Sequence, residues 1–393
     1  ALAATIKKAD AVYMDAEKFF SETYDIARDR FLEAAGRAGG RLAHYGHPSA
    51  HGPDGIALSL DTAWFGPEDA TTVLLNTSGT HGAEGFAGSA AQLAWINTCG
   101  PLDLPPDTAA LLVHAVNPFG FAWGLRATEN NVDINRNFVD HSVPLPDNPL
   151  YEELHSFLCP KSLDDAAMQK ILAEGTRFVE RNGQWALEDA MSRGQYTHPD
   201  GYHFGGHAAE WSNTTMRHIV KTELSRTTRI GFIDWHSGPA GDGELIHLCF
   251  SKPDSAQFAR AAHWWGREAL DPKTVNSMWG SRRPSRRGIM FWGLEAQLGP
   301  HAQFAGAVIE FRSAMQKSNP SKAMRASLLE RWLRFEAGLD APDAQKYFDE
   351  IREDYAPRRK SWHTNVIRNA LECYRTTLIG LGEWKHESLR AAD

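Results

Sequence analysis

The sequence predicts an α/β fold: a mixed, mostly parallel central sheet with helices on both faces, followed by a helical C-terminal extension. Short apolar runs alternate with longer stretches of helical periodicity, which is the pattern of α/β folds. Four of the runs end near positions 79, 116, 235 and 310, and polar or metal-competent residues gather at each end. In open α/β sheets, ligands bind where strands end and helices begin. The fold and the place of its site are therefore predicted together.

The composition is that of an ordinary globular protein. The chain has 393 residues, of which 42% are hydrophobic and 23% are charged, so it can bury a substantial core. The balance of 41 basic against 49 acidic residues gives a net charge of -8, which argues against a nucleic-acid-binding surface. No stretch approaches the roughly 20 apolar residues that a membrane-spanning helix needs. We expect neither nucleic acid nor a membrane as partner.

The four cysteines lie far apart and form no CxxC pair. This spacing suggests neither a disulfide framework nor a cysteine zinc site. The N-terminal segment ALAATIKKAD contains no apolar signal sequence. The cysteine pattern fits a reducing compartment, so we expect a cytoplasmic protein, with an export signal removed before Ala1 as the alternative. The four cysteines are Cys99, Cys159, Cys249 and Cys373.

We expect residues 1–393 to form one domain, with an N-terminal helix and early strands in 1–70. The range Phe19–Ala38 has the periodicity of an amphipathic helix, which ends at a Gly-Gly pair. Two early strands, Arg41–Tyr45 and Ile56–Phe65, follow on either side of a turn-rich segment. These elements are expected to flank a catalytic core in 70–315.

The stretch Thr72–Gly88 combines a buried strand with a polar turn. Its unbroken apolar residues are typical of a strand covered on both faces, and a helical pattern resumes after the turn. The turn carries His81 and Glu84, which could chelate one zinc ion. A catalytic zinc usually has three protein ligands, so an HxxE pair alone is weak evidence for metal, and by itself it favours a hydrogen-bonded loop histidine beside a surface glutamate.

A second apolar strand, Leu111–Val116, is followed by a polar segment. Two arginines in one short segment favour a pocket for an anionic group, because a guanidinium matches a carboxylate with two parallel hydrogen bonds. Internal salt bridges to Glu129 and Asp133 explain the same residues, and spacing alone leaves both interpretations open. The polar residues concerned are Arg126, Asp133, Asn135 and Arg136.

The middle of the chain is less regular. A charged helix is expected at Leu163–Arg181, followed by the Gly- and His-rich run GQYTHPDGYHFGGHAAEWSN. Its histidines, His198, His203 and His207, lack a fixed ligand spacing. We expect them to be exposed or to line a pocket rather than bind metal. Such a segment suits a lid or a substrate-contacting loop.

A third strand, Arg229–Trp235, follows an expected helix at Thr214–Arg226 and ends at His236. This imidazole is placed like His81, at the carboxyl end of a strand. It is a candidate third ligand, or a residue that caps the strand end by hydrogen bonding. Further along, Leu245–Phe250 has a strand pattern and Ala256–Leu270 a helical one.

The last clear strand, Gly306–Phe311, carries one acid, Glu310, among apolar residues. An acid in such a strand is costly unless it faces a site. The alternatives are an edge position or pairing with Arg312. The region 316–393 has helical patterns, and we expect it to cover the core without contributing to chemistry. Its helical stretches are Met324–Phe335, Tyr347–Ile351 and Trp362–Leu381.

The ordered set HxxE, R, NR, H and E resembles the zinc carboxypeptidases of the funnelin type. The fuller segments are HGAEG, NPFGF, ENNVDINRNF, IDWHSG and IEFRS. They are similar to a bacterial branch of that superfamily known only as a domain of unknown function. The resemblance covers roughly residues 70–315. It implies a metallopeptidase with one Zn²⁺ ion.

The resemblance also implies a role for each residue of the set. His81, Glu84 and His236 would hold zinc, and Glu310 would be the general base and acid. Arg126 would polarise the scissile carbonyl. Asn135 and Arg136 would bind the terminal carboxylate of the substrate. Asp133 would accept a hydrogen bond from the second nitrogen of His81, as metal-bound imidazoles generally require.

The spacing from Arg126 to Asn135 is shorter than in digestive carboxypeptidases and is similar to that of aspartoacylase-like relatives, which cleave small N-acyl amino acids. The candidate substrates are therefore peptides or N-acyl amino acids with a free carboxylate. Tyr202 is the candidate for the substrate-capping tyrosine of the family. A catalytically silent carboxylate-binding module is the alternative from another class of function, although a complete set of ligands, base and arginines argues against it.

Overall fold

The computed structural model describes residues 15–98, 100–238, 242–270, 285–312, 325 and 328–390, with side chains up to residue 384. The first half contains η1 (Ala16–Phe19), α2 (Tyr24–Arg37), β1 (Arg41–His51), η2 (Pro53–Gly55), β2 (Ala57–Phe65), β3 (Thr72–Thr77), α3 (Gly85–Thr98), η3 (Gly100–Leu102), β4 (Thr108–His114), α4 (Pro118–Trp123), α5 (Ile134–Asn137), α6 (Tyr151–Leu158), α7 (Asp165–Asn182) and α8 (Gln184–Ser192). The second half contains α9 (Trp211–Glu223), β5 (Arg229–Ser237), β6 (Leu245–Leu248), α10 (Ala256–Trp265), α11 (Arg267–Leu270), α12 (Met290–Leu298), η4 (Gly299–His301), β7 (Gln303–Phe311), η5 (Leu333–Ala337), α14 (Ala344–Tyr355) and α15 (Lys360–Arg390).

The strands form one seven-stranded mixed sheet in the order β1-β2-β4-β3-β5-β7-β6. The central strands β4, β3, β5 and β7 run parallel to one another. The outer strands β1, β2 and β6 are antiparallel to their neighbours. The predicted mixed, mostly parallel sheet is confirmed, and the four strands that end in candidate site residues are its parallel core.

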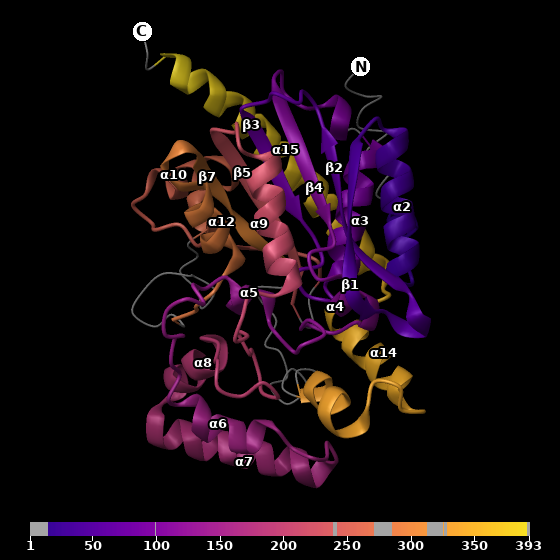
Figure 1. The fold of residues 1–393 in the computed structure, drawn as a ribbon, viewed down its shortest axis with the longest axis vertical. Helices are drawn as coiled ribbons and strands as arrows, with labels where there is room; N and C mark the ends of the chain where they lie inside the picture. Colours follow the sequence, from indigo (N-terminus) through magenta and orange to yellow (C-terminus); the bar gives the residue numbers. More distant parts are fainter. Residues whose placement is uncertain are drawn as a thin grey trace.

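Helices cover both faces of the sheet (Figure 1). Leu74 points into a core formed with α2, α3 and α15, whereas Val73 and Leu75 point into a core formed with α9 and α12. The alternation follows from strand geometry, in which successive side chains face opposite sides. Burial on both faces explains why the sequence of β3 is continuously apolar instead of alternating.

The long helix α15 is tied to the middle of the sheet by a buried hydrogen-bonded chain. Tyr374 donates from its hydroxyl to Asn76 Oδ1 of β3 at 2.6 Å, and Trp235 of β5 donates from Nε1 to the same hydroxyl at 2.9 Å. Burial raises the pKa of Tyr374 far above its usual value, so the hydroxyl stays protonated. The C-terminal helix is therefore part of the core.

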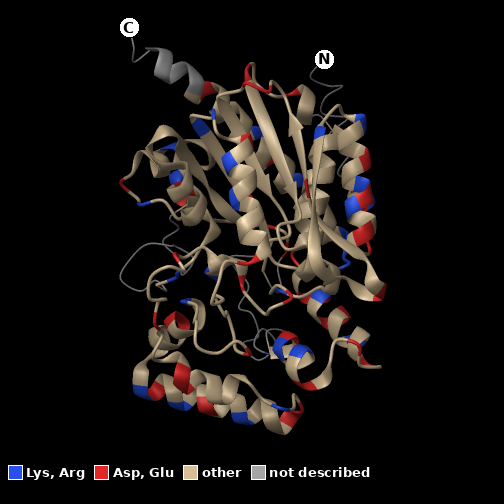
Figure 2. Cartoon of the chain, viewed as in Figure 1, with Lys and Arg blue, Asp and Glu red and all other residues tan. Residues whose placement is uncertain are grey.

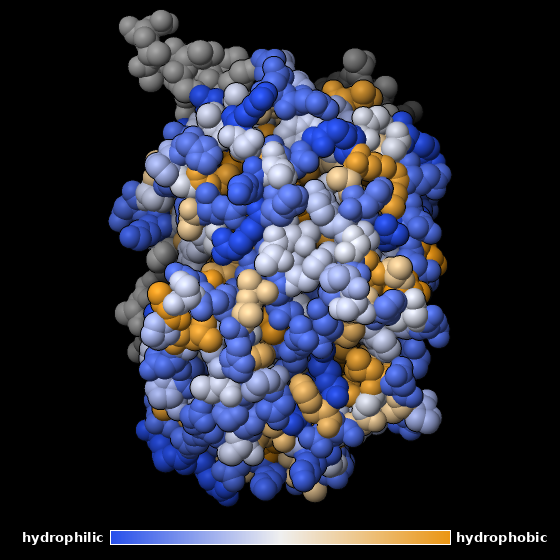
Figure 3. Space-filling view, in the orientation of Figure 1, coloured by the Kyte–Doolittle hydropathy of each residue, from blue (hydrophilic) through white to orange (hydrophobic). Residues whose placement is uncertain are grey.

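A separate layer lies beyond the carboxyl ends of the parallel strands. There α6, α7 and α8 share a small apolar core that includes Tyr151 and Phe178, distinct from the two sheet cores. Figure 1 shows these helices and α14 below the sheet, and Figure 2 shows acidic and basic residues interspersed along α7. In Figure 3, apolar residues lie in small groups over a mostly hydrophilic face.

The bounds of several elements differ from the expectation, among them α9, β6, β7 and α14, and two further differences have a clear physical cause. Strand β1 continues to His51, beyond the expected end at Tyr45, because an edge strand tolerates Pro48 and a register shift after Gly46. The helix expected at Ala256–Leu270 is broken in two at Gly266, which has φ +87°. Among the described residues, no helix has the length and apolar character needed to cross a membrane.

Candidate metal centre

The turn after β3 places His81 and Glu84 at the start of α3. This turn requires glycine at two positions. A Cβ on Gly82 would lie 1.9 Å from the Gly120 carbonyl oxygen, and Gly79 has φ +64°. The amide of Gly82 donates to the Leu125 carbonyl at 2.9 Å, which ties the turn to the segment after α4. The small residues of HGAEG therefore serve close backbone packing.

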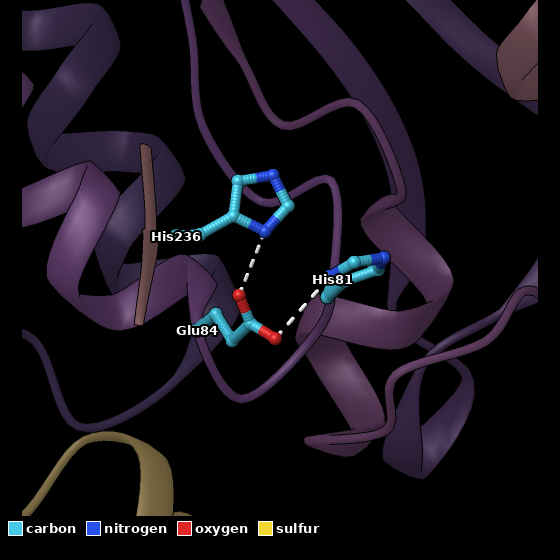
Figure 4. A group of neighbouring side chains, drawn as sticks. All are labelled: His81, Glu84 and His236. Atoms are coloured by element: carbon cyan, nitrogen blue, oxygen red, sulfur yellow. Dashed lines mark hydrogen bonds and ion pairs between the residues drawn. The ribbon is translucent and has the colours of Figure 1, made fainter. Parts of the chain in front are cut away.

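His81, Glu84 and His236 meet at the carboxyl ends of β3 and β5. One ligand atom from each lies within 4.8 Å of the others, and all three residues are buried. Figure 4 shows the Glu84 carboxylate between the two imidazoles, with one oxygen facing each ring. Oε1 lies 3.2 Å from His81 Nδ1, and Oε2 lies 2.8 Å from His236 Nδ1. We call these three residues the buried group.

Each imidazole of the buried group donates a hydrogen bond from its second ring nitrogen to an aspartate. His81 Nε2 donates to Asp133 Oδ1 at 3.1 Å, and His236 Nε2 donates to Asp234 Oδ2 at 2.7 Å. Asp234 in turn accepts hydrogen bonds from the hydroxyls of Thr77 and Thr80. These contacts orient both rings so that Nδ1 of each faces Glu84.

The electrostatics of the buried group favour a carboxylate and a bound cation. Burial opposes ionisation of Glu84, but the two imidazoles outweigh it and hold its pKa well below the usual range. Burial also acts to lower the pKa of His236, and Asp234 with Glu84 raises it well above the usual value. The pocket thus stabilises positive charge next to the Glu84 carboxylate.

The arrangement fits a divalent metal ion. With Nε2–H directed at an aspartate, each neutral imidazole presents the lone pair of Nδ1 to a carboxylate oxygen, and a proton or a cation must lie between them. The buried Nδ1 of His81 lies 3.2 Å from Glu84 Oε1 but makes no well-aligned hydrogen bond to any described residue. Ligand atoms on a tetrahedral zinc stand roughly 3.4 Å apart, given bonds of about 2.0 to 2.2 Å. The donor set of two histidines and one glutamate suits zinc.

A pocket of about 250 Å³ opens beside the buried group, and Arg126 lines it. Arg126 Nε donates to Asp133 at 3.0 Å, and one terminal nitrogen donates to Glu84 at 3.4 Å. Burial opposes its charge, but Asp133 and Glu84 keep its pKa above the usual value. The sequence left open whether Arg126 forms a salt bridge to Asp133 or lines a pocket. In the structure Arg126 does both.

Glu310 lies in register with His236 on the neighbouring parallel strand. Because aligned residues of a parallel pair face the same side, the two side chains share one face of the sheet. The carboxylate of Glu310 accepts from Arg312 at 3.4 Å, which is the pairing that the sequence allowed. Glu310 is not among the residues that line the pocket.

Asn135 and Arg136 also lie behind the pocket lining. Asn135 Oδ1 accepts from the Met290 amide at 3.0 Å. The buried guanidinium of Arg136 donates to the carbonyls of Asn135 and Ser192, and its Nε has no hydrogen-bond partner within the described residues. Burial lowers the pKa of Arg136. Ser192 lines the pocket and Arg136 does not, so Arg136 is separated from the pocket by its contact residue Ser192.

The Gly- and His-rich run contributes Gly201, Tyr202 and His203 to the pocket wall. His203 Nδ1 donates to the Met191 carbonyl at 2.5 Å, and its Nε2 lies 4.0 Å from Asp133. Burial lowers the pKa of His203 to about 3, so it is neutral at pH 7.

The C-terminal region, which the sequence predicts to be a covering layer, also contributes residues to the pocket wall. Glu330, Arg331, Ile351 and Tyr355 line the pocket. Glu330 accepts hydrogen bonds from the amides of Arg126 at 2.6 Å and Ala127 at 2.9 Å. It therefore holds the backbone that carries Arg126.

Sequence reasoning missed Asp234 and Glu330. A signal for Asp234 exists, because residues two apart in a strand share a face, and the DWH segment thereby places Asp234 beside His236. Nothing in the sequence marks Glu330, which lies in a charged helical stretch far from the strand ends. Its role depends on how the chain folds back over the pocket.

Comparison with known families finds one match, the family model "Protein of unknown function (DUF2817)", over residues 20–369. No curated protein matches the sequence.

Several solved structures are similar to this chain at low sequence identity. Bovine thrombin-activatable fibrinolysis inhibitor, in complex with tick carboxypeptidase inhibitor, is 10% identical with a TM-score of 0.44, covering 92% of this chain and 99% of its own. Carboxypeptidase A from Helicoverpa armigera is 11% identical with a TM-score of 0.43, covering 84% and 73%. The succinylglutamate desuccinylase from Chromobacterium violaceum is 12% identical with a TM-score of 0.33, covering 77% and 72%.

Proposed function

We propose that this chain, which belongs to the DUF2817 family, is a zinc-dependent hydrolase that cleaves an amide or peptide bond adjacent to a free carboxylate. One observation carries the proposal: His81, Glu84 and His236 converge in a buried site, and each imidazole is backed by an aspartate. Three protein ligands with an adjoining pocket are typical of catalytic zinc. A silent binding module would not need both oriented imidazoles and a guanidinium beside them.

Bound to the buried group, zinc would supply Lewis-acid activation of water and of the substrate carbonyl. The other functions fall to the chain itself. Arg126 already lines the pocket and offers a fixed positive charge where the carbonyl oxygen becomes negative. Asp133 holds Arg126 and His81 together, so it orients a zinc ligand and the charge stabiliser at once.

We assign Glu310 the role of general base and acid. It would accept a proton from the attacking water and return it to the leaving amine, as a single carboxylate can do in both directions. Support comes from its position beside His236 at the end of β7. The products would be a carboxylic acid and an amine.

We assign Asn135 and Arg136 to binding of the substrate carboxylate, with Tyr202 closing over the substrate from the pocket wall. The buried guanidinium of Arg136 has carbonyl acceptors and an unpartnered Nε, so an anion would complement it. Ser192, whose carbonyl accepts from Arg136, lines the pocket, and the neighbouring Gly194 packs so closely that a Cβ there would lie 2.6 Å from Arg136 Cδ. Carboxylate binding therefore requires this turn to shift.

A second candidate is a deacylase of N-acyl amino acids. The pocket of about 250 Å³ favours it, because pockets for drug-sized ligands usually measure about 300 to 1,000 Å³. A short acyl amino acid fits this space more readily than a long peptide. Both candidates use the same zinc ligands and the same base.

The two candidates are separated by their substrates. Zinc-loaded protein would be assayed against blocked dipeptides and N-acetyl amino acids, each with and without a free carboxylate and with and without chelator. We expect hydrolysis of one class, dependent on zinc and on the carboxylate. Hydrolysis of neither class by zinc-loaded protein would favour the silent binding module.

The assignment of Glu310 has its own test. Glu310→Gln keeps the size of the side chain but cannot accept a proton, so turnover should fall by about 10² to 10⁴-fold with zinc still bound. Arg312→Gln is the matched control, since it removes the partner of Glu310 and leaves the carboxylate. Full turnover in Glu310→Gln would show that another group is the base.

A further inference from the structure

A second group of metal-competent side chains lies outside the proposed hydrolase site. His155, Cys159 and Asp200 each offer one ligand atom, and these atoms lie within 4.8 Å of one another. His155 is on α6, Cys159 directly follows that helix, and Asp200 is in the loop after α8. We call these three residues the outer group. In Figure 1, α6 lies at the bottom of the molecule, away from the sheet.

The geometry of the outer group follows from helix periodicity. Residues four apart lie on one side of a helix, so Cys159 Sγ comes within 3.3 Å of His155 Nδ1. On the other side of the ring, His155 Nε2 lies 3.7 Å from Asp200 Oδ1. Ligand atoms on a tetrahedral zinc stand roughly 3.5 Å apart for a sulfur bond of about 2.3 Å and a nitrogen bond of about 2.0 Å. The 3.3 Å between Sγ and Nδ1 matches that scale. Asp200 contacts the other ring nitrogen, but its ligand atom lies within 4.8 Å of the other two, so its side chain would turn from Nε2 to share one cation with them.

Neighbouring residues hold the outer group in place. His198 stacks on His155 with ring centroids 3.8 Å apart and an interplanar angle of 17°. Arg331 donates to the Asp200 carbonyl and to its Oδ2, each at 3.1 Å, which leaves Oδ1 turned toward His155. The loop that carries Asp200 is thus fixed on both sides of the candidate site.

The local charge also favours a cation. Two carboxylates near the outer group, those of Asp200 and Glu336, bind the guanidinium of Arg331, and a third, that of Glu152, contacts His198. Burial and the neighbouring His198 lower the pKa of His155, so its ring is neutral at pH 7 with a lone pair available. Burial raises the pKa of the Cys159 thiol to about 11 against the effect of Arg331. A bound metal would displace that proton to solvent.

We propose that His155, Cys159 and Asp200 form a second metal site, which takes zinc or another thiophilic divalent cation. Thiolate, imidazole and carboxylate together are a zinc donor set, with water as the fourth ligand. The sequence argued against a cysteine zinc site because it has no CxxC pair. Here the donor set of the single sulfur is completed by a histidine on the preceding helix and an aspartate from a distant loop.

A metal bound at the outer group would stabilise the part of the pocket wall that contains Tyr202. Asp200 immediately precedes Gly201 and Tyr202, which line the pocket. A cation that joins Asp200 to the end of α6 fixes the loop that carries Tyr202. The role is structural, and the proposal stands whether or not the buried group supports hydrolysis.

The test is X-ray absorption at the zinc edge on the full chain carrying Glu84→Ala, which removes a ligand from the buried group. We expect bound zinc with a sulfur neighbour at about 2.3 Å. Adding Cys159→Ser should abolish the sulfur neighbour. Adding Cys249→Ala should leave it, since Cys249 is a buried thiol in a separate apolar cluster.

Two results would overturn the proposal: zinc-loaded Glu84→Ala protein without a sulfur neighbour, or a sulfur neighbour that survives Cys159→Ser. If Cys159→Ser fails to fold, cobalt titration of Glu84→Ala with and without Asp200→Asn decides the question. Both should show a thiolate-to-cobalt absorption band, and Asp200→Asn should need more cobalt to reach it. An unchanged titration, or no band, refutes the site.

Discussion

The buried group and the outer group contain similar side chains but hold their imidazoles differently. In the buried group, His81 and His236 each direct Nε2 at an aspartate and Nδ1 at the shared carboxylate. In the outer group, His155 has a thiol at one nitrogen and a carboxylate at the other. The buried group lies at the ends of sheet strands, whereas the outer group joins a helix end to a loop.

This difference indicates how strongly each group is preorganised for metal. An acceptor behind a ligating imidazole fixes its tautomer and its angle, and its loss typically costs 10 to 100-fold in metal affinity or activity. The buried group has two such acceptors, Asp234 within β5 and Asp133 at the N-terminus of α5. The outer group has ring stacking instead and is partly exposed. We therefore expect the buried group to hold zinc more tightly.

The largest expected effect comes from removing the shared carboxylate of the buried group. Glu84→Ala should eliminate zinc binding there and reduce hydrolysis to the uncatalysed background, because both imidazoles lose the ligand that faces them. Metal content after dialysis and turnover of the preferred substrate measure the two effects. A variant that kept full turnover would show that the buried group is not the catalytic centre.

A smaller loss of zinc affinity should follow when one imidazole of the buried group loses its aspartate acceptor, as the imidazole of the outer group forms no hydrogen bond to an aspartate among the described residues. Asp234→Asn replaces the carboxylate behind His236 with a neutral amide and keeps the hydrogen-bonded shape. Zinc affinity at the buried group should fall by about 10 to 100-fold. Competition with a chelator of known affinity measures the change.

Glu152→Gln is the matched control for this change. Glu152 accepts from His198 beside the outer group and does not touch the buried one. It should leave zinc affinity at the buried group unaltered. Equal losses in the two variants would mean that net charge, rather than the contact to His236, sets the affinity.

The contrast also explains what could be predicted from the sequence. The buried group was predictable because its members lie in the turn after one apolar strand and at the end of another, and parallel strands bring their ends to one edge. Glu330 and Asp200 were not, because each lies in a polar stretch whose partners are set by how α6–α8 and the C-terminal region fold over that edge. The Asn135 and Arg136 pair shows that a recognisable motif does not fix the position of its side chains. Both residues are easily found in the sequence, yet neither lines the pocket.

The C-terminal region links the two groups through adjacent residues. Glu330 accepts from the backbone amides of Arg126 and Ala127 at the buried group, and Arg331 binds Asp200 of the outer group. One short segment therefore contacts both. A change in the position of this segment would therefore move both Arg126 and the loop that carries Tyr202.

The smallest effect should come from loosening this segment at Glu330. Glu330→Gln weakens two charge-assisted hydrogen bonds to the Arg126 loop, which we expect to cost roughly 1.4 kcal/mol, or about tenfold in kcat. KM and zinc content should change little, since Arg126 acts on the transition state rather than on the metal. Glu336→Gln is the matched control, because Glu336 contacts Arg331 rather than Arg126. A loss of zinc in Glu330→Gln, or an equal loss of kcat in Glu336→Gln, would show that the segment supports the fold generally and does not position Arg126.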